Sequence, residues 1–305
     1  MKISIVIPTK NAENYIKNLI KSLNNQTIKP YEIIVMDSNS IDNTKSICMQ
    51  FKNTKVFQVI DFNHGKTRND GVKIAVGDII IFMTQDAIPK DNYLIENLVK
   101  PLNNNIVGSY ARQVANKNSD SIEKFSRQFN YPDFDIIKNN NRISELGIKS
   151  YFFSNVCSAF IRKEFFRLGG FPEDVIMNED MVMASKILNS NKSTYYASDA
   201  IVIHSHKYSY KEQFKRNFDV GVALVDNKDY FGNTKSESEG IKFVKEAIKF
   251  LIKNNRFYLI PHLVIQSCFK YLGFKFGSNY KKLPLNIVKK MSMHSFYFDR
   301  KEKLL

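Results

Sequence analysis

The first hundred residues alternate apolar runs of strand length with amphipathic segments, and this rhythm constrains the fold more than any other feature. The expected strands cover residues 3–7, 32–36, 56–60 and 79–83, and the expected helices cover residues 14–24, a short stretch from 42, and 66–75. Strands that alternate with helices in this order form a parallel sheet with helices on its faces. We therefore predict an α/β fold built on a mostly parallel, Rossmann-like sheet.

Two common phosphate-binding sequences are missing from this chain. No Gly-x-Gly-x-x-Gly follows the first expected strand, which argues against a dinucleotide site, and no Walker loop is present, which argues against an NTPase. Acidic residues do follow strands, with Asp37 after the second and Asp86 after the fourth. Because open parallel sheets bind ligands at the carboxyl ends of their strands, we expect a site there. Asp86 is suited to a divalent cation that bridges to phosphate.

The middle of the chain is less regular than its beginning. Residues 103–149 are rich in asparagine, serine and charged residues and show little periodicity, so we expect a variable excursion from the core. Order resumes at Tyr151, with a strand expected within residues 152–162 and a short helix at 163–168.

Two further groups of titratable residues follow this stretch. Glu179 and Asp180 lie where a helix is expected to begin, a position at which carboxylates complement the helix dipole. Residues 201–206 are expected to form a strand whose period-two alternation places His204 and His206 on one face. Two histidines on one face are a possible pair of metal ligands.

Most of the net charge of +15 lies near the end of the chain. Residues 240–305 contain 14 lysines and arginines against three acids, which gives +11. One helical face there carries Lys242, Lys245, Lys249 and Lys253. The apolar run 257–269 is interrupted by Pro261 and is shorter than the ~20 residues of a membrane-spanning helix. We predict a basic amphipathic helical extension on an anionic membrane surface. The alternative is a helical cap on the core with solvated lysines.

The cysteines and the start of the chain indicate the compartment. Cys48, Cys157 and Cys268 have neither paired nor metal-ligand spacing, which fits a reducing environment. The apolar run before Pro8 is too short for a signal peptide. We therefore expect a cytoplasmic protein, which the basic extension would attach to the inner face of the plasma membrane.

Several short motifs occur in an order that resembles one enzyme family. They are Ile5-Val-Ile-Pro-Thr-Lys-Asn11, Phe62-Asn-His-Gly-Lys-Thr-Arg-Asn69, Phe82-Met-Thr-Gln-Asp-Ala87, Phe129-Asn-Tyr-Pro132, Phe153-Ser-Asn155, Glu179-Asp180 after Gly169-Gly-Phe171, and Val202-Ile-His-Ser-His206. Together they resemble the inverting GT-A fold glycosyltransferases of the large family two, and within it the bacterial rhamnosyltransferases. The resemblance rests on the motifs occurring together in this order and structural context.

The resemblance implies a domain organisation. It covers residues 2–221, so we expect a glycosyltransferase domain at 1–221, with a nucleotide-binding half at about 1–102 and an acceptor-binding half at about 103–221. Residues 222–305 would then form the basic helical region. The fold expected from the resemblance is of the GT-A type.

The resemblance also implies a reaction and its partners. The expected reaction moves a sugar, L-rhamnose from dTDP-rhamnose, with inversion to a hydroxyl of a polyprenyl-linked saccharide in cell-surface polysaccharide synthesis. Donors that stay open are UDP-hexoses and other deoxysugars. The expected partners are a nucleotide sugar, a saccharide acceptor and an anionic membrane, with no nucleic acid, and the oligomeric state is left open.

Residue roles follow from the same resemblance. The donor nucleotide sugar would be bound by Pro8, Thr9, Asp37, His64, Arg68, Gln85 and Asp86. Asp86 would hold Mg²⁺ or Mn²⁺, with His204 or His206 completing the coordination. Asp180 would be the general base that takes the acceptor proton. Asn155 and Glu179 would lie on the acceptor side.

Two departures from the family pattern affect the metal. Thr84 stands where the first acid of the aspartate-x-aspartate motif is expected, and only Asp37-Ser38 remains of the acidic pair after the second strand. We therefore expect weak metal affinity. Structural roles are the alternatives at each position: the two aspartates as caps, the acidic pair as dipole complements, the histidines as core residues, and Arg68 in an ion pair with Asp70 or Asp78.

Two other functional classes are weighed against the transferase. A basic nucleic-acid-binding protein is disfavoured because the chain has no recognised nucleic-acid module and its charge is concentrated in one terminal segment. A sugar-phosphate nucleotidyltransferase shares the α/β core, but its glycine-rich phosphate loop after the first strand is absent.

Overall fold

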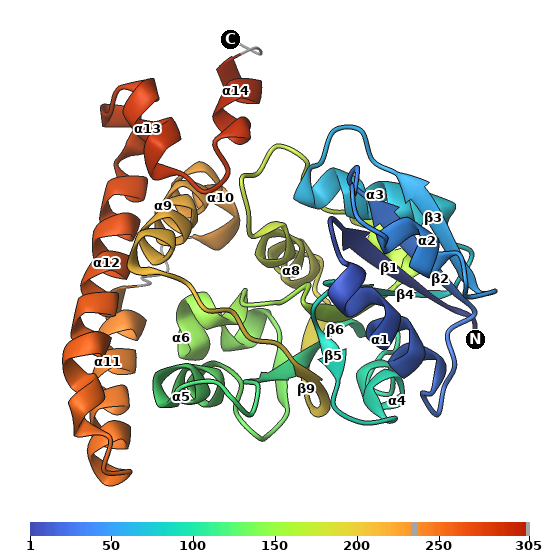
Figure 1. Ribbon diagram of the computed structural model, residues 1–305, viewed down its shortest axis with the longest axis horizontal. Coiled ribbons are helices and arrows are strands. Elements are labelled where there is room, and N and C mark those ends of the chain that lie inside the picture. The colour runs from blue at the N-terminus through green and yellow to red at the C-terminus, as the bar shows by residue number, and fades with distance from the viewer. Residues whose placement is uncertain (233–236, 303–305) are drawn as a thin grey trace. The chain divides into compact units, whose positions relative to one another are not determined.

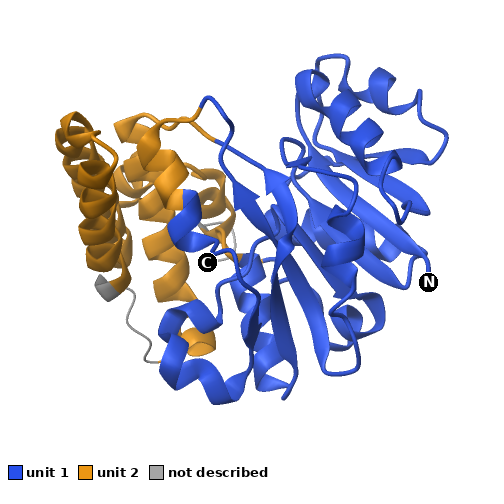
Figure 2. Cartoon of the chain, turned by 90° about the horizontal axis from the view of Figure 1, so that it is seen from below, with its two compact units in different colours: residues 1–118, 127–173, 179–205 blue, residues 119–126, 174–178, 206–305 orange. Residues whose placement is uncertain are grey.

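The computed structural model describes residues 1–232 and 237–302, and the chain divides into two compact units (Figure 2). Unit 1 comprises residues 1–118, 127–173 and 179–205. Unit 2 comprises residues 119–126, 174–178 and 206–305. Each unit is described by itself below.

A nine-stranded sheet forms the centre of unit 1 (Figure 1). Its strands are β1 (Ile3–Thr9), β2 (Glu32–Asp37), β3 (Thr54–Gln58), β4 (Ile79–Met83), β5 (Ile88–Pro89), β6 (Ile106–Val114), β7 (Ile136–Lys138), β8 (Cys157–Ile161) and β9 (Ser193–Ile203). The strand order is β3-β2-β1-β4-β8-β6-β9-β5, and β7 pairs with β9. Strands β1 to β4 are parallel neighbours, while β8 runs antiparallel to both β4 and β6.

The directions of the strands confirm the predicted sheet type. Because β6 is parallel to β9 and both run with β4, only β5, β7 and β8 point the other way in the described sheet. The sheet is therefore mostly parallel. The early elements also lie close to the predicted ranges. The strand expected at 56–60 and the helix expected at 66–75 each begin two residues earlier, at Thr54 and His64.

Helices cover both faces of this sheet. Those of unit 1 are α1 (Glu13–Asn24), α2 (Thr44–Cys48), α3 (His64–Ile74), α4 (Leu94–Val99), α6 (Ile143–Leu146), α7 (Arg162–Arg167), α8 (Glu179–Asn189) and the short 3₁₀ helices η1 (Asn140–Arg142) and η2 (Gly147–Ser150). The buried stripe of α1 shares a core cluster with Ile5 and Ile7 of β1. Helix α3 lies on the other face, where Gly71 is close to Val6.

The expectation of a variable excursion at 103–149 was wrong for β6, which lies between β8 and β9 inside the sheet. Its sequence does not read as a buried strand because it carries Gly108, Ser109 and Gln113. Gly108 leaves room for the ring of Phe160, since a Cβ there would lie 3.0 Å from that ring. The hydroxyl of Ser109 donates to the Leu98 carbonyl at 2.6 Å. Hydrogen bonds thus allow polar side chains to be buried in a central strand.

Unit 2 is helical. Its elements are α9 (Tyr210–Asp226), α10 (Lys228–Phe231), α11 (Glu237–Lys253), η3 (Phe257–Leu259), α12 (Ile260–Ser278), η4 (Tyr280–Lys282), α13 (Leu285–Met291) and α14 (Phe296–Glu302), and α5 (Ser121–Asn130) crosses the division between the units. Helices α9 and α12 approach very closely (Figure 1), because a Cβ at Gly273 or Gly277 would lie 2.2 or 2.0 Å from a carbonyl oxygen of α9. Only glycine permits such backbone contact.

The terminal helices confirm one prediction and correct another. In α11, Ala247 and Leu251 are buried while the four lysines of the basic face are exposed, so the helix is amphipathic as predicted. Pro261 does not interrupt the apolar run, because it occupies the first turn of α12, where proline is tolerated. In the described residues, no helix combines the length and apolar character needed to span a bilayer.

Candidate active site

The carboxyl ends of β1 and β2 form the first part of the site. Thr9 and Asp37 are register partners at these two ends. Asp37 is buried, and its carboxylate accepts hydrogen bonds from the backbone N–H and the hydroxyl of Ser40. Thr9 and Asp37 therefore lie side by side at the ends of their strands, as the sequence prediction requires.

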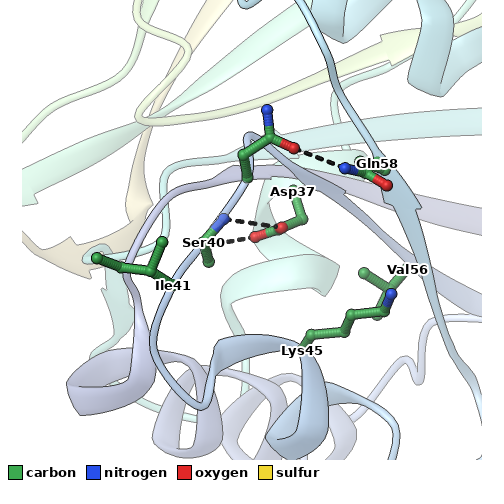
Figure 3. Close-up of a pocket in the computed structure, with 7 residues that line it drawn as sticks. Asp37, Ser40, Ile41, Lys45, Val56 and Gln58 are labelled. Carbon is green, nitrogen blue, oxygen red and sulfur yellow. Dashed lines mark hydrogen bonds between the residues drawn. The ribbon is translucent and has the colours of Figure 1, made fainter.

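A pocket with a volume of about 240 Å³ opens beside Asp37 (Figure 3). Its walls are Asp37, Asn39, Ser40, Ile41, Lys45, Val56 and Gln58. Figure 3 shows the two Ser40–Asp37 bonds, and Gln58 closes one side by donating to the side chain of Asn39 at 2.7 Å. Pro8 and Thr9 do not line this pocket. The pocket lining thus combines the carboxylate of Asp37, the ammonium group of Lys45 and apolar side chains.

Three buried hydroxyls lie at the ends of neighbouring strands. Thr9 is the last residue of β1, and Ser38 and Thr84 come directly after β2 and β4. The side-chain oxygen of each is buried without a hydrogen-bond partner among the described residues. Unsatisfied buried polar atoms in native proteins call for an explanation, such as a bound ligand or water. Their position at one edge of the sheet is the ligand edge of open α/β folds. Of these three residues, the sequence prediction named Thr9 for donor binding but gave no binding role to Ser38 or Thr84.

Gln85 connects the segment after β4 with the segment after β1. Its side-chain oxygen accepts from the Lys10 N–H at 2.8 Å, and its side-chain nitrogen donates to the Lys10 carbonyl at 3.1 Å. Both ends of the amide thus bind backbone. In this structure Gln85 holds two strand ends together, and its predicted contact with the donor stays a prediction.

The predicted metal ligands lie close together. Ile88 of β5 pairs with Ile203 of β9, which brings Asp86 next to His204. Asp86 Oδ2 lies 3.5 Å from His204 Nε2, and ligand atoms of Asp86, His204 and His206 all lie within 4.8 Å of one another. Strand β9 ends at Ile203, so strand alternation does not place the histidines as predicted.

This arrangement is compatible with a cation. The 3.5 Å separation of Asp86 and His204 is longer than a good hydrogen bond. Two ligand atoms that bind one octahedral cation at about 2.1 Å and at right angles lie about 3.0 Å apart. A small movement of Asp86 and His204 toward each other would therefore let both bind the same cation. Carboxylate oxygen and imidazole nitrogen are both common ligands of divalent metals.

The acidic pair at the start of α8 is buried and has defined partners. Arg68 of α3 forms an ion pair with Glu179, at 3.3 Å between Nη1 and Oε1. The side chain of Asn155 donates to the same Glu179 oxygen at 3.1 Å. Although burial raises the pKa of Glu179, Arg68, His64 and Asn155 bring that pKa below its ordinary value. Glu179 is therefore held as a carboxylate.

Arg68 does not pair with Asp70 or Asp78, the two alternatives that its sequence neighbourhood suggested. Asp70 binds Lys66 and Lys73 instead, and Asp78 accepts from the backbone N–H of Lys2. The partner of Arg68 lies 111 positions away in the sequence, at Glu179. No local sequence signal could have identified it.

Asp180 differs from its neighbour. Its carboxylate accepts from the backbone N–H groups of Asn155 at 3.0 Å and Met181 at 2.9 Å. Burial, and then the neighbouring Glu179 carboxylate, raise the pKa of Asp180 to about 7. The helix dipole favours an ionised carboxylate at this position, but desolvation and the like charge of Glu179 outweigh the dipole. A pKa near neutrality suits a general base.

The first turn of α3 explains how these side chains meet. Gly65 allows close packing, because a Cβ there would lie 1.9 Å from the Pro172 carbonyl oxygen. Asn69 binds both the N–H and the carbonyl of Phe171, at 3.0 and 2.9 Å. The segment that leads toward α8 is thus fixed against α3. His64, at the start of α3, contacts Phe62 edge-on with 4.9 Å between ring centroids.

Comparison with solved structures agrees with this architecture. The mannosyltransferase PcManGT from Pyrobaculum calidifontis, solved with GDP-Man and Mn²⁺, superposes with a TM-score of 0.59 at 16% identity, covering 97% of this chain and 84% of that one. The chain therefore has the GT-A fold of glycosyltransferases.

Sequence comparison gives the family. The chain belongs to Glycosyl transferase family 2, whose profile matches residues 4–167. It is 39% identical to the O-antigen chain rhamnosyltransferase RfbN of Salmonella typhimurium over 98% of this chain and 96% of that protein. It is 35% identical to the O-antigen chain rhamnosyltransferase WbaN of Salmonella anatum over 97% and 95% of the two chains. The predicted family, fold and enzyme class are confirmed, and the chain is a glycosyltransferase.

Proposed function

We propose that this glycosyltransferase moves L-rhamnose from dTDP-rhamnose, with inversion, to a hydroxyl of a saccharide acceptor. The observation that supports this donor is the near full-length similarity to two rhamnosyltransferases. A UDP-hexose or another deoxysugar is the alternative donor. The acceptor we propose is a polyprenyl-linked saccharide of a cell-surface polysaccharide.

The pocket beside Asp37 is the proposed nucleoside site. Val56 and Ile41 offer apolar surface to a pyrimidine ring, and Asp37 offers a carboxylate that can accept from its imide N–H. The unpartnered hydroxyls of Thr9, Ser38 and Thr84 lie along the same edge of the sheet and can donate to ligand oxygens.

Asp86 and the two histidines are the proposed metal site. A divalent cation there would neutralise charge on the leaving diphosphate. One carboxylate with two imidazoles is a softer set than the all-oxygen ligands that Mg²⁺ prefers, so we propose Mn²⁺ as the better fit. Thr84 in place of an acid removes one negative ligand, which is why weak affinity is expected.

Asp180 is the proposed general base. The acceptor oxygen forms a bond to the anomeric carbon while the bond from that carbon to the diphosphate oxygen breaks, and the acceptor proton passes to the Asp180 carboxylate. The nucleoside diphosphate leaves with the bonding electrons. Glu179, held by Arg68 and Asn155, stays ionised beside Asp180 and raises its proton affinity. We place Asn155 and Glu179 as supports on the acceptor side.

A thermal-shift screen of nucleotide sugars tests the donor. A ligand at a hundredfold excess over its Kd stabilises the folded protein by about 2.7 kcal/mol. We expect dTDP-rhamnose with Mn²⁺ to give the largest rise in Tm, with UDP-glucose and GDP-mannose as matched alternatives. A larger rise with a UDP-sugar would replace rhamnose as the proposed donor.

We propose that unit 2 docks on an anionic membrane. The lysine face of α11 is exposed, and so is a set of apolar side chains on the next elements: Phe257, Tyr258, Val264, Ile265, Phe269, Tyr271, Leu272 and Phe276. Phe257 and Tyr258 are 66% and 58% exposed at the turn between α11 and α12, next to the exposed Arg256. Exposed apolar surface beside a basic face is typical of interfacial attachment.

Replacing the four lysines of the α11 face by glutamine is expected to weaken binding to vesicles that contain phosphatidylglycerol. Each basic residue contributes about 1 kcal/mol near an anionic surface, so affinity at low salt should fall by roughly one to three orders of magnitude. Sedimentation with phosphatidylcholine vesicles, with and without phosphatidylglycerol, measures this. The matched control changes Lys17, Lys21, Lys29 and Lys52, which are exposed in unit 1. Equal loss in both variants would contradict a specific α11 surface.

A further inference from the structure

Gln113 is a buried polar residue that the reaction scheme does not use. It lies near the end of β6 and is only 3% exposed. Its amide contacts four side chains of unit 1, which are Arg127, Tyr131, Ser154 and His204. A buried amide with this many partners is fixed in one orientation.

Arg127 determines that orientation. Its Nη1 lies 2.8 Å from the Gln113 oxygen atom Oε1. A guanidinium group only donates hydrogen bonds, so the amide atom that faces it must be the oxygen. The opposite atom, Nε2, then donates to the Ser154 hydroxyl at 2.9 Å and to the Tyr131 hydroxyl, both of which can accept. The two ends of the network therefore agree on how the amide points.

The same oxygen determines the tautomer of His204. Its Nδ1 lies 2.9 Å from Gln113 Oε1, and an amide oxygen only accepts. Nδ1 must therefore carry a hydrogen. In a neutral imidazole the lone pair is then on Nε2, the nitrogen that lies 3.5 Å from Asp86 Oδ2. The backbone N–H of His204 is also fixed, because it donates to the Val114 carbonyl at 3.0 Å.

We propose that Gln113, oriented by Arg127, is a positioning residue that holds His204 in the Nδ1–H tautomer so that Nε2 coordinates the divalent cation together with Asp86. The inference rests on the proposed metal site and adds its supporting shell. Partners that bind the second nitrogen of a ligating histidine fix its tautomer and ring orientation, and their loss typically weakens metal affinity 10- to 100-fold.

The first test is the Kd of Mn²⁺ for the full chain, measured by electron paramagnetic resonance of the free ion. We expect Gln113→Leu to weaken binding roughly 10- to 100-fold. Gln113→Glu should stay close to wild type, because a carboxylate still accepts from both Arg127 and His204. An equal Kd for wild type and Gln113→Leu would overturn the positioning role. Absence of Mn²⁺ binding in the wild type would overturn the metal site itself, and the inference with it.

The second test reads the tautomer without metal. The chain has five histidines, so ¹⁵N-labelled imidazole spectra can be assigned by comparison with a His204→Gln variant. At a pH where the rings are neutral, we expect His204 to be the Nδ1–H tautomer in the wild type and a mixture in Gln113→Leu. If Gln113→Leu fails to fold, Arg127→Met replaces it, because the amide can then rotate and the same mixture is expected. A wild-type Nε2–H tautomer, or a tautomer unchanged in the folded variants, would overturn the proposal.

Discussion

Replacing Asp180 by asparagine is expected to lower turnover by roughly 10² to 10⁴ while leaving donor binding nearly unchanged. Asparagine keeps the shape, but it cannot take a proton. Because the carboxylate accepts from Asn155 through Oδ2 and from Met181 through Oδ1, the single amide oxygen of asparagine can keep only one of these two bonds. An inverting displacement has no covalent intermediate, so one base has to serve the whole reaction. Steady-state kinetics with a donor-binding titration measure the two effects separately.

Glu179→Gln is the matched control, and its expected signature differs. It should reduce turnover less, but it removes the charge that faces buried Arg68, and breaking a buried ion pair on one side is strongly destabilising. We therefore expect a lower Tm for Glu179→Gln than for Asp180→Asn. The reverse pattern in turnover, with Glu179→Gln inactive and Asp180→Asn active, would exchange the two roles.

The wild-type pH profile gives a further check on the same residue. Burial and Glu179 raise the pKa of Asp180 to about 7, and only the ionised carboxylate can accept the proton. Turnover should therefore rise as the pH increases through this value, and it should fall as Asp180 becomes protonated at lower pH. A rate that stays level down to the ordinary pKa of an aspartate would contradict Asp180 as the base.

Asp86→Asn should lower the rate by orders of magnitude without unfolding the protein, and EDTA should suppress the wild type. Asparagine lacks the negative charge that Asp86 offers a divalent cation. Because Asp86 is partly exposed, its replacement should leave stability nearly unchanged. The measurements are initial rates with added Mn²⁺ or Mg²⁺ and the Tm of each variant. Asp70→Asn, which removes a surface carboxylate paired with lysines, is the control. Full activity of wild type in chelator would contradict the metal site.

The strand ends could be predicted from sequence because parallel sheets obey a simple rule. Apolar runs in the sequence identified β1, β2 and β4. The carboxylates of Asp37, at the end of β2, and Asp86, after β4, lie at the ligand edge of the sheet. His204 was predicted as a partner of Asp86, and the β5–β9 pairing brings them together. These features depend on local patterns of sequence.

The remaining features depend on contacts between distant segments. Strand β6 could not be recognised, since the burial of Ser109 and Gln113 depends on hydrogen bonds to partners elsewhere in the chain. For the same reason the Arg68–Glu179 pair was not predicted. The raised pKa of Asp180 was also missed, because desolvation in the folded chain overrides the helix dipole that the sequence suggested.

Product analysis by ¹H NMR tests the central claim most directly. Wild-type protein with Mn²⁺, dTDP-rhamnose and short saccharides on a synthetic polyprenyl diphosphate should release one dTDP for each new glycosidic bond. The new bond should have the anomeric configuration opposite to that of the donor, and Asp180→Asn should form almost none of it. Retention of configuration, or release of pyrophosphate in place of the nucleoside diphosphate, would contradict the account.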